Sequence, residues 1–249
     1  MPPSDPSLPM FYQQPRALLT TVHADCGIEP VTDYSFAASA NSVPIGAEEF
    51  YEAQAHYPIV FTTAEPATAV VVLGLEQDRN LFVLDDHSWR PGSYIPAYVR
   101  RYPFVFVTND NDFVLGVDEA AASFSRTGGQ PLFENGEPSA MTKRAIDFCS
   151  AFQVQDRIVR EFTAALQAHD LLIPHRADFQ DAGGQGRRSL TGFTMIDEPR
   201  FTGLADEVFL DWRKRNWLGL VYAHLLSMRR WRSLAPLLDP TRMEVGGAA

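Results

Sequence analysis

The chain contains 249 residues, of which 45% are hydrophobic and 12% aromatic, so it can bury a sizeable core and is not a disordered protein. Its formal net charge of −10 repels phosphate backbones and anionic lipid, which argues against nucleic acid as a partner. No apolar stretch approaches the length of a membrane span, so we expect no membrane insertion. The N-terminus lacks the pattern of a signal peptide. Cys26 and Cys149 form no CxxC motif, which suits a reducing cytoplasm. Cys149 is expected to be a small core residue.

In chain order, residues 1–15 contain five prolines and are expected to form a flexible arm. Residues 42–56 predict a short helix with Phe50, Ala53 and Tyr57 on one face. Strands are then expected over 59–63, 68–75 and 81–86, with burial of the second on both faces.

The sequence Tyr-Pro-apolar-Val-Phe occurs twice, at 57–61 and again at 102–106. Each copy follows a short helical segment and precedes a second strand that contains Leu-Gly, at 73–74 and at 115–116. We interpret this as an internal duplication of a helix and β-hairpin, about 44–86 and 90–135. The duplication predicts one sheet, equivalent helix-to-strand junctions, and burial of Phe61 and Phe106 in one continuous core.

Residues 141–169 predict one long helix with a buried stripe, formed by Phe148, Phe152, Val159, Phe162 and Leu166. A hairpin over 175–180 and 187–197 turns at "DAGGQG", and two helices follow over 204–215 and 217–238. The last residues, 241–249, are expected to be disordered. The predicted fold is a single α+β domain over 16–240, with duplicated helix–hairpin units in an antiparallel or mixed sheet packed against the long helix and the C-terminal helices.

Four segments resemble the bacterial SapC family in the same order along the chain. They are "DYSFAASANSVPIGAEEFYEAQAHYPIVF" (33–61), "YIPAYVRRYPFVF" (94–106), "LTGFTMIDE" (190–198) and "YAHLLSM" (222–228). The resemblance implies a protein of similar length linked by name to a bacterial surface layer. Members occur near TonB-dependent receptors, flavin-dependent halogenase-like proteins and cupin-like proteins, which implies a role in uptake or modification. The peptide-transporter permease of the same name would need membrane spans, so it is set aside. The resemblance carries over no catalytic residues.

Three groups of side chains have metal-ligand character, and each also has an ordinary structural explanation. His23 and Asp25 supply part of a facial iron triad, although they suit a surface turn better. Glu48, Glu52 and His56 repeat every four residues and could ligate a metal, but this is also the expected solvated face of the helix. The acidic run 109–112, with the nearby Asp118 and Glu119, lacks the spacing of a calcium-binding loop. We therefore expect no metal or other cofactor.

Five residues are the candidates for a ligand site, because they are polar groups placed near predicted apolar surfaces. His224 lies within a face of Trp, Leu and Met, where a lone histidine is usually a satisfied core residue. Arg100 and Arg101 could clamp an anion, or could complement the end of a helix or pair with Asp110 or Asp112. Tyr222 and Asn41 complete the set.

No GxSxG, HExxH, GxGxxG or Walker A motif is present, so the catalytic residues, if there are any, are unknown and the sequence does not decide whether the chain is an enzyme. The first hypothesis is a soluble cytoplasmic accessory or binding protein that assists a surface, receptor or modification system through contacts with a protein partner. The alternative is an enzyme or small-molecule-binding protein with a pocket between the duplicated sheet and the C-terminal helix.

Overall fold

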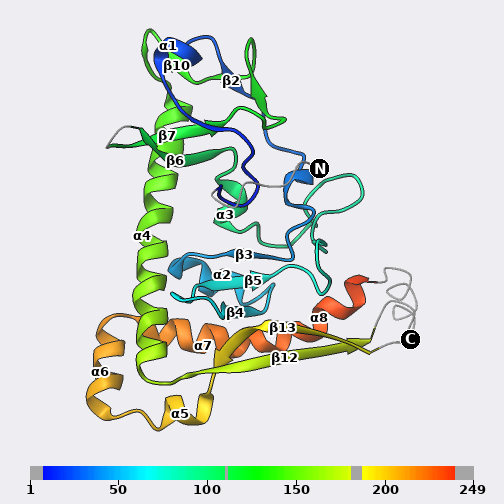
Figure 1. Cartoon of the computed structure of the whole chain (residues 1–249), viewed down its shortest axis with the longest axis vertical. Helices are drawn as coiled ribbons and strands as arrows, with labels where there is room; N and C mark the ends of the chain where they lie inside the picture. The colour runs from blue at the N-terminus through cyan, green and yellow to red at the C-terminus, as the bar shows by residue number, and fades with distance from the viewer. Residues whose placement is uncertain (1–7, 110–111, 181–186, 239–249) are drawn as a thin grey trace. The chain divides into compact units, whose positions relative to one another are not determined.

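The chain folds as two compact units, each assembled from two separate stretches of sequence. Unit 1 comprises Met1–Phe36 and Tyr98–Val154, and unit 2 comprises Ala37–Ala97 and Gln155–Ala249. The computed structural model describes residues 8–109, 112–180 and 187–238. Antiparallel sheets, a long helix and a run of C-terminal helices confirm the predicted α+β class (Figure 1).

Unit 1 contains two small three-stranded antiparallel sheets. The first has the order β1-β7-β6, and the second has the order β8-β2-β9. A further two-stranded ladder joins β10 to β11. The strands are β1 (Pro15–Ala17), β2 (Gly27–Ile28), β6 (Phe104–Asn109), β7 (Asp112–Asp118), β8 (Phe124–Ser125), β9 (Gln130–Pro131), β10 (Phe133–Glu134) and β11 (Glu137–Pro138).

The segment before β1 is packed along part of its length, which differs from the expected flexible arm. Tyr12 is buried, and its hydroxyl donates to the backbone oxygen of Phe104. β1 then pairs antiparallel with β7, and the ladder runs from Pro15 opposite Asp118 to Ala17 opposite Gly116. The prolines of this segment have no backbone N–H group, and tertiary contacts provide acceptors for the N–H groups that remain.

The core of unit 1 gathers apolar side chains from both sheets and from the first half of α4 (Ala140–Ala168). Cys26 and Cys149 lie in this core and are free thiols. Burial raises the pKa of Cys149 to about 11, so its thiol stays protonated at neutral pH. The expectation of a core cysteine at 149 is therefore met.

Unit 2 is built on one five-stranded antiparallel sheet with the order β12-β13-β4-β5-β3. The predicted hairpin of 175–180 and 187–197 corresponds to its two longest strands, and its turn, 181–186, lies outside the described residues. The strands are β3 (Ser42–Pro44), β4 (Ile59–Thr62), β5 (Ala69–Val72), β12 (Leu172–Gln180) and β13 (Arg187–Ile196).

Helices supply the rest of the core of unit 2. Phe162, from the second half of α4, is fully buried, and its ring lies about 6 Å from those of Phe61, Trp212 and Trp217. α7 contacts both β4 and β13 (Figure 1). The helices are α2 (Phe50–Ala53), α5 (Glu198–Thr202), α6 (Asp206–Lys214), α7 (Trp217–Ser227) and α8 (Trp231–Leu234), and the 3-10 helices are η2 (Ala47–Glu49), η3 (Met228–Arg230) and η4 (Ala235–Leu238).

Each of the two predicted helix–hairpin segments forms a short helix followed by two paired strands, but the two hairpins enter different sheets. β4 and β5 belong to the sheet of unit 2, whereas β6 and β7 belong to the β1-β7-β6 sheet of unit 1, so the prediction of one sheet is wrong. Tyr57 follows α2 by four residues, Tyr102 follows α3 (Ala97–Arg100) by two, and each precedes a strand. Phe61 is fully buried, but Phe106 is only partly buried against the core of unit 1.

The matched Leu-Gly pairs do not occupy equivalent places in the two hairpins. Phe61 lies opposite Ala69, and Phe106 lies opposite Leu115, so Leu115 is the counterpart of Ala69. Leu73 instead follows the end of β5. The shift arises because Leu73 follows Phe61 by 12 residues, whereas Leu115 follows Phe106 by only 9.

Two shorter predictions also need correction. Residues 81–86 form no strand, and the only β-bridge of this segment in the described structure joins Val83 to Trp89. Residues 42–56 divide into a strand, a 3-10 turn and one turn of α-helix, because Pro44 occupies the edge strand β3. The expected disordered tail, 241–249, lies outside the described residues.

Candidate functional site

The five predicted ligand-binding residues do not belong to one unit. Arg100 and Arg101 are in unit 1, whereas Asn41, Tyr222 and His224 are in unit 2. The backbone oxygen of Asn41 accepts hydrogen bonds from the backbone N–H groups of residues 73 and 74, so this residue extends the antiparallel pairing of β3 with β5.

Arg101 packs among aromatic rings. Its guanidinium lies 4.1 Å from the ring centroid of Tyr98 and 4.8 Å from that of Phe152. The exposed Arg100 lies 5.3 Å from the ring centroid of Phe148. These contacts are cation–π interactions, in which Arg101 contacts α3 and α4 and Arg100 contacts α4.

His224 is fully buried, and both of its ring nitrogens are engaged by the backbone. Its Nδ1–H donates to the oxygen of Ile59 at 2.8 Å, and its Nε2 accepts from the N–H of Ile196 at 3.1 Å. Burial lowers the pKa of His224 to about 4, so the ring is neutral near pH 7. The histidine therefore connects α7 to β4 and β13, in keeping with a satisfied core residue. Tyr222, two residues earlier, is 50% exposed on another face of α7.

A pocket of about 240 Å³ lies elsewhere in unit 2 and includes none of the five predicted residues. Ligand pockets commonly occupy roughly 300–1,000 Å³ and are mostly apolar, so this one is small and polar by comparison. Its lining residues are Thr62, Thr63, Ala64, Glu65, Gln167, Asp170, Leu172 and Thr194.

The metal-ligand candidates are separated or engaged in other contacts. His23 is buried whereas Asp25 is exposed, and His23 contacts Glu119. His56 lies in a turn beyond α2, with Nε2 3.4 Å from Oε1 of Glu52. Within 8–109, 112–180 and 187–238, no group of three or more His, Cys, Asp or Glu side chains could hold a metal ion.

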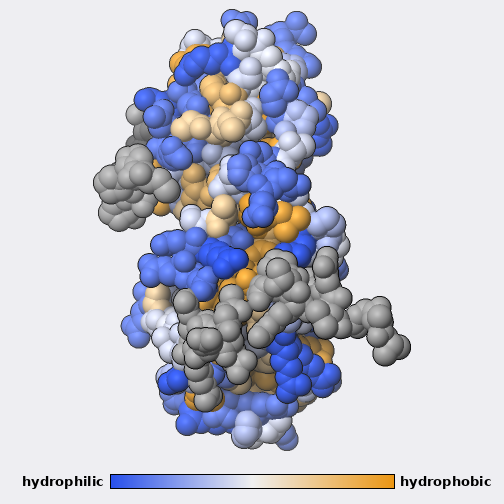
Figure 2. All heavy atoms as spheres, turned by 90° about the vertical axis from the view of Figure 1, so that its right-hand side faces the viewer, coloured by the Kyte–Doolittle hydropathy of each residue, from blue (hydrophilic) through white to orange (hydrophobic). Residues whose placement is uncertain are grey.

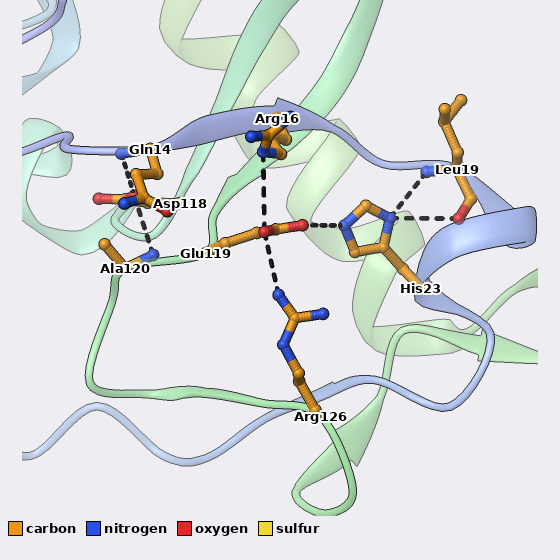
Figure 3. Close-up of polar contacts among 8 residues, drawn as sticks. All are labelled: Gln14, Arg16, Leu19, His23, Asp118, Glu119, Ala120 and Arg126. Carbon is orange, nitrogen blue, oxygen red and sulfur yellow. Dashed lines mark hydrogen bonds and ion pairs between the residues drawn. The ribbon is translucent and has the colours of Figure 1, made fainter.

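A polar cluster that the sequence did not predict surrounds two consecutive carboxylates at the end of β7. Asp118 is fully buried and accepts hydrogen bonds from the N–H groups of Gln13, Gln14 and Ala120 at 2.7–3.2 Å. Figure 3 shows the contacts with Gln14 and Ala120. The hydroxyl of Tyr102 also donates to Asp118, at 3.2 Å. Burial, and then the neighbouring carboxylate, raise the pKa of Tyr102.

Glu119 is the centre of the second half of this cluster. Its carboxylate lies 3.1 Å from Nε2 of His23 and 3.1 Å from the guanidinium of Arg126, with Arg16 at 3.7 Å (Figure 3). Nδ1 of His23 lies 3.2 Å from both the backbone nitrogen and the backbone oxygen of Leu19. These contacts suit the tautomer with its proton on Nε2, which then donates to Glu119.

A histidine oriented by a carboxylate is also the arrangement of a general base, but this one cannot touch a substrate as it stands. His23 is fully buried, and the nitrogen not facing Glu119 faces its own backbone at Leu19. The cluster instead joins residues 13–23 to 118–126. We conclude that its chemistry is structural.

Unit 2 has a comparable anchor at Glu49, which the sequence also did not predict. Its carboxylate accepts hydrogen bonds from the N–H groups of Gly46 and Ala97 at 2.7 and 2.6 Å, and from the hydroxyl of Tyr94 at 2.9 Å. The contact with Gly46 follows the helix N-terminal pattern in which a glutamate bonds back three residues. The other two partners lie more than 40 residues away, so they have no local signal.

A surface on α7 differs from these clusters, because its side chains remain half exposed, although the ring of Tyr222 also contacts that of the buried Phe201. Tyr222 and Leu226 are 50% and 53% exposed, and they lie four residues apart on one side of the helix. Figure 2 shows one face of the molecule, on which hydrophilic residues predominate and hydrophobic residues occur in separate groups. Single exposed apolar residues are ordinary, so the charges around α7 decide whether this surface binds anything.

The fold and the site together define an α+β protein whose buried polar groups anchor its own backbone and whose C-terminal helices carry an exposed apolar surface. Residues 18–234 match the family model described as SapC, so the chain belongs to the SapC family. Comparison with curated proteins finds no match, and neither does comparison with solved structures. Among the described residues, the helices include none with both the length and the apolar character needed to cross a membrane.

Proposed function

We propose that the chain is an accessory protein of a bacterial cell-surface, receptor or modification system, and that it acts by binding another protein. Membership of the SapC family supports the setting. The observation that carries the proposal is the exposed pair Tyr222 and Leu226 on α7, a helix whose opposite side is buried. Protein interfaces are enriched in such aromatic and aliphatic anchors surrounded by polar groups.

The two reduced thiols support a cytoplasmic location for this role. Cys26 and Cys149 both lie in the core of unit 1 and are not paired with each other. Structural disulfides form in oxidising compartments and are rare in the cytoplasm. The net charge of −10 also favours a protein partner over nucleic acid.

The competing proposal is an enzyme or a small-molecule-binding protein. Its pocket would be the polar one lined by Glu65 and Asp170, because His224 is already satisfied by backbone groups. The present geometry favours the binding role, since the buried histidines and carboxylates have partners within the chain.

Affinity capture from a lysate of the native host, followed by mass spectrometry, tests the proposal. We expect a defined protein to be enriched over a capture with an unrelated acidic protein of similar size. The same preparation is then incubated with a metabolite extract and profiled for consumed compounds. Turnover of a small molecule together with no enriched protein would replace the binding role with the enzymatic one.

A further inference from the structure

At one end of the exposed surface of α7, Gly219 has no side chain, and Tyr51 packs against the helix there. A side chain at Gly219 would collide with the ring and hydroxyl oxygen of Tyr51. Tyr51 therefore lies across α7 while remaining 53% exposed. The aromatic ring extends the apolar surface formed by Tyr222 and Leu226 onto the neighbouring helix α2.

The helical segment that carries Tyr222 and Leu226 is strongly basic, although the protein as a whole is acidic and the exposed Glu48 and Glu52 lie near Tyr51 in sequence. Residues 211–232 contain six arginine or lysine residues and a single acidic residue, which gives a net charge of +5. The remaining residues therefore carry a net charge of −15. Such a separation of charge within one chain points to an interaction site of defined sign.

Most of these basic side chains are not neutralised within the described structure. Asp211 pairs with Arg215 at 2.9 Å, and Arg230 donates to the backbone oxygen of Gln54. The other four basic residues are exposed and make no ion pair with any described residue. They are Arg213, Lys214, Arg229 and Arg232.

Arg229 lies on the same side of the helix as the exposed apolar side chains. It follows Leu226 by three residues and Tyr222 by seven, and residues with these spacings share one side of a helix. The backbone stays in the right-handed helical region through Met228 and Trp231, so the spacing holds across η3. At the other end, Arg213 and Lys214 close α6, which packs against α7.

We propose that the surface formed by Tyr51, Tyr222, Leu226, Arg213, Lys214 and Arg229, termed here the α7 surface, binds an acidic polypeptide segment that carries apolar side chains. This proposal rests on the proposed function and specifies the chemistry of the partner. Apolar side chains of the segment contact the tyrosines and Leu226, and its carboxylates face the three basic residues. Charges of this kind speed association and select the partner, while the central apolar contacts supply most of the affinity.

A polypeptide fits this surface better than an anionic membrane does. The exposed apolar groups are two tyrosines and one leucine, fewer than the broad apolar face with which helices enter a bilayer interface. The net charge of −15 on the rest of the chain also opposes approach to an anionic bilayer. A short acidic segment can reach the basic residues without bringing the whole chain against a charged plane.

The experiment uses the full chain and a phage-displayed library of random peptides as the probe. Selected peptides are synthesised and their affinities are measured by fluorescence polarisation at low and moderate salt. We expect them to combine acidic residues with aromatic or aliphatic residues and to bind more weakly as salt increases. The triple variant R213E/K214E/R229E should weaken them about tenfold or more, because it reverses three charges next to the apolar anchors.

A matched control reverses the same residue types elsewhere. Lys143, Arg144 and Arg157 are exposed on α4, and K143E/R144E/R157E changes the net charge by the same amount. We expect this control to retain most of the affinity. A second variant, L226Q, should weaken the peptides without changing charge. Circular dichroism melts confirm that each variant is folded.

Several results would overturn the proposal. Peptides without an excess of acidic residues, or equal losses in the two charge-reversed variants, would remove the basis for an acidic partner at this surface. Binding to phosphatidylserine vesicles without peptide binding would assign the surface to a membrane. Self-association in analytical ultracentrifugation that R213E/K214E/R229E abolishes would assign it to a second copy.

The outcome is separable from that of the proposed function. If the host protein captured by the wild-type chain is still captured by R213E/K214E/R229E and by L226Q, the chain binds a protein at another surface. The proposed function then stands, and the assignment of the α7 surface fails. If no host protein is captured while the peptides bind as expected, the surface chemistry stands without its biological partner.

Discussion

The buried His224 should make the stability of the protein fall in mild acid. Adding a proton to its Nε2 would place an N–H against the N–H of Ile196, which now donates to that nitrogen. The folded state therefore holds the pKa at about 4, whereas an unfolded histidine has a pKa of about 6.5. A lowered pKa means that the unfolded state binds the proton more tightly, so stability is highest above about pH 6.5 and falls as pH decreases toward about 4.

The size of this effect follows from the two pKa values. Each tenfold difference in proton affinity corresponds to about 1.4 kcal/mol. The full loss between about pH 6.5 and about pH 4 is therefore on the order of 3 kcal/mol, and about 2 kcal/mol of it is reached by about pH 5. This is a large share of the roughly 5–15 kcal/mol that stabilises an ordinary domain.

Urea unfolding at about pH 7 and about pH 5 measures the loss, and His224→Gln isolates the contribution of this residue. The variant is less stable at about pH 7, because at least one buried backbone group loses its partner, at a cost of about 1–3 kcal/mol. Its stability should nevertheless change less between the two pH values than that of the wild type.

The exposed His169 provides the control, because His169→Gln should leave the pH dependence as it is. Parallel pH profiles for the wild type and His224→Gln would refute the reasoning. If His224→Gln does not fold, an NMR titration of the His224 ring in the wild-type protein takes the place of the comparison. A midpoint near that of a free histidine would also refute the reasoning.

Three further predictions concern the two hairpins, the polar cluster and the cysteines. Phe61→Ala should lower the free energy of unfolding by about 3–5 kcal/mol in denaturant melts, because the ring is fully buried. Phe106→Ala should lower it clearly less, because its ring is only partly buried. Equal losses of stability in the two variants would contradict the difference in burial. Asp118→Ala should lower the free energy of unfolding by on the order of 3 kcal/mol and increase hydrogen exchange at Gln13 and Gln14, which lose their acceptor. Asp25→Ala, at an exposed position, serves as the control. Unchanged exchange in Asp118→Ala would mean that Asp118 does not hold this segment. Cys149 should react with a thiol reagent near pH 8 only as fast as the protein opens, so reaction of the folded chain at the rate of a free cysteine would show that the thiol is accessible.

Local elements were predictable from the sequence because their causes are local. The buried stripe of α4 followed from apolar spacing, and Val159, Phe162 and Leu166 are all buried. The hairpin of β12 and β13 followed from two strand-forming runs around a glycine-rich turn. The two Tyr-Pro junctions likewise marked where helical segments end and strands begin.

The choice of sheet was not predictable, because each strand of a hairpin has a second edge that any strand can occupy. β4 accepts β13, which lies more than 100 residues later, whereas β7 accepts β1 from near the N-terminus. Nothing within the repeated sequence distinguishes these partners. Phe106 consequently faces a different and smaller core than Phe61.

The same reasoning explains which site residues the sequence identified. His224 was recognisable as a core histidine from its apolar helix face, but its partners Ile59 and Ile196 are far away in sequence. In the sequence, Asp118 and Glu119 are recognisable only as acidic residues near a predicted turn. Their burial depends on the pairing of β1 with β7, and no periodic pattern in the sequence indicates that pairing.

The interleaving of the two units has a consequence for how the protein is made. The chain leaves unit 1 after Phe36, returns at Tyr98 and leaves it again after Val154, so each unit is complete only when its second stretch has been synthesised. During translation, β4 must wait for β13 to emerge from the ribosome before the central ladder of its sheet can close. A chain that ends after Val154 would keep both stretches of unit 1, but it would also carry residues 37–97 without the rest of unit 2. Expression of unit 1 alone would require a linker in place of residues 37–97, with the chain ending within α4.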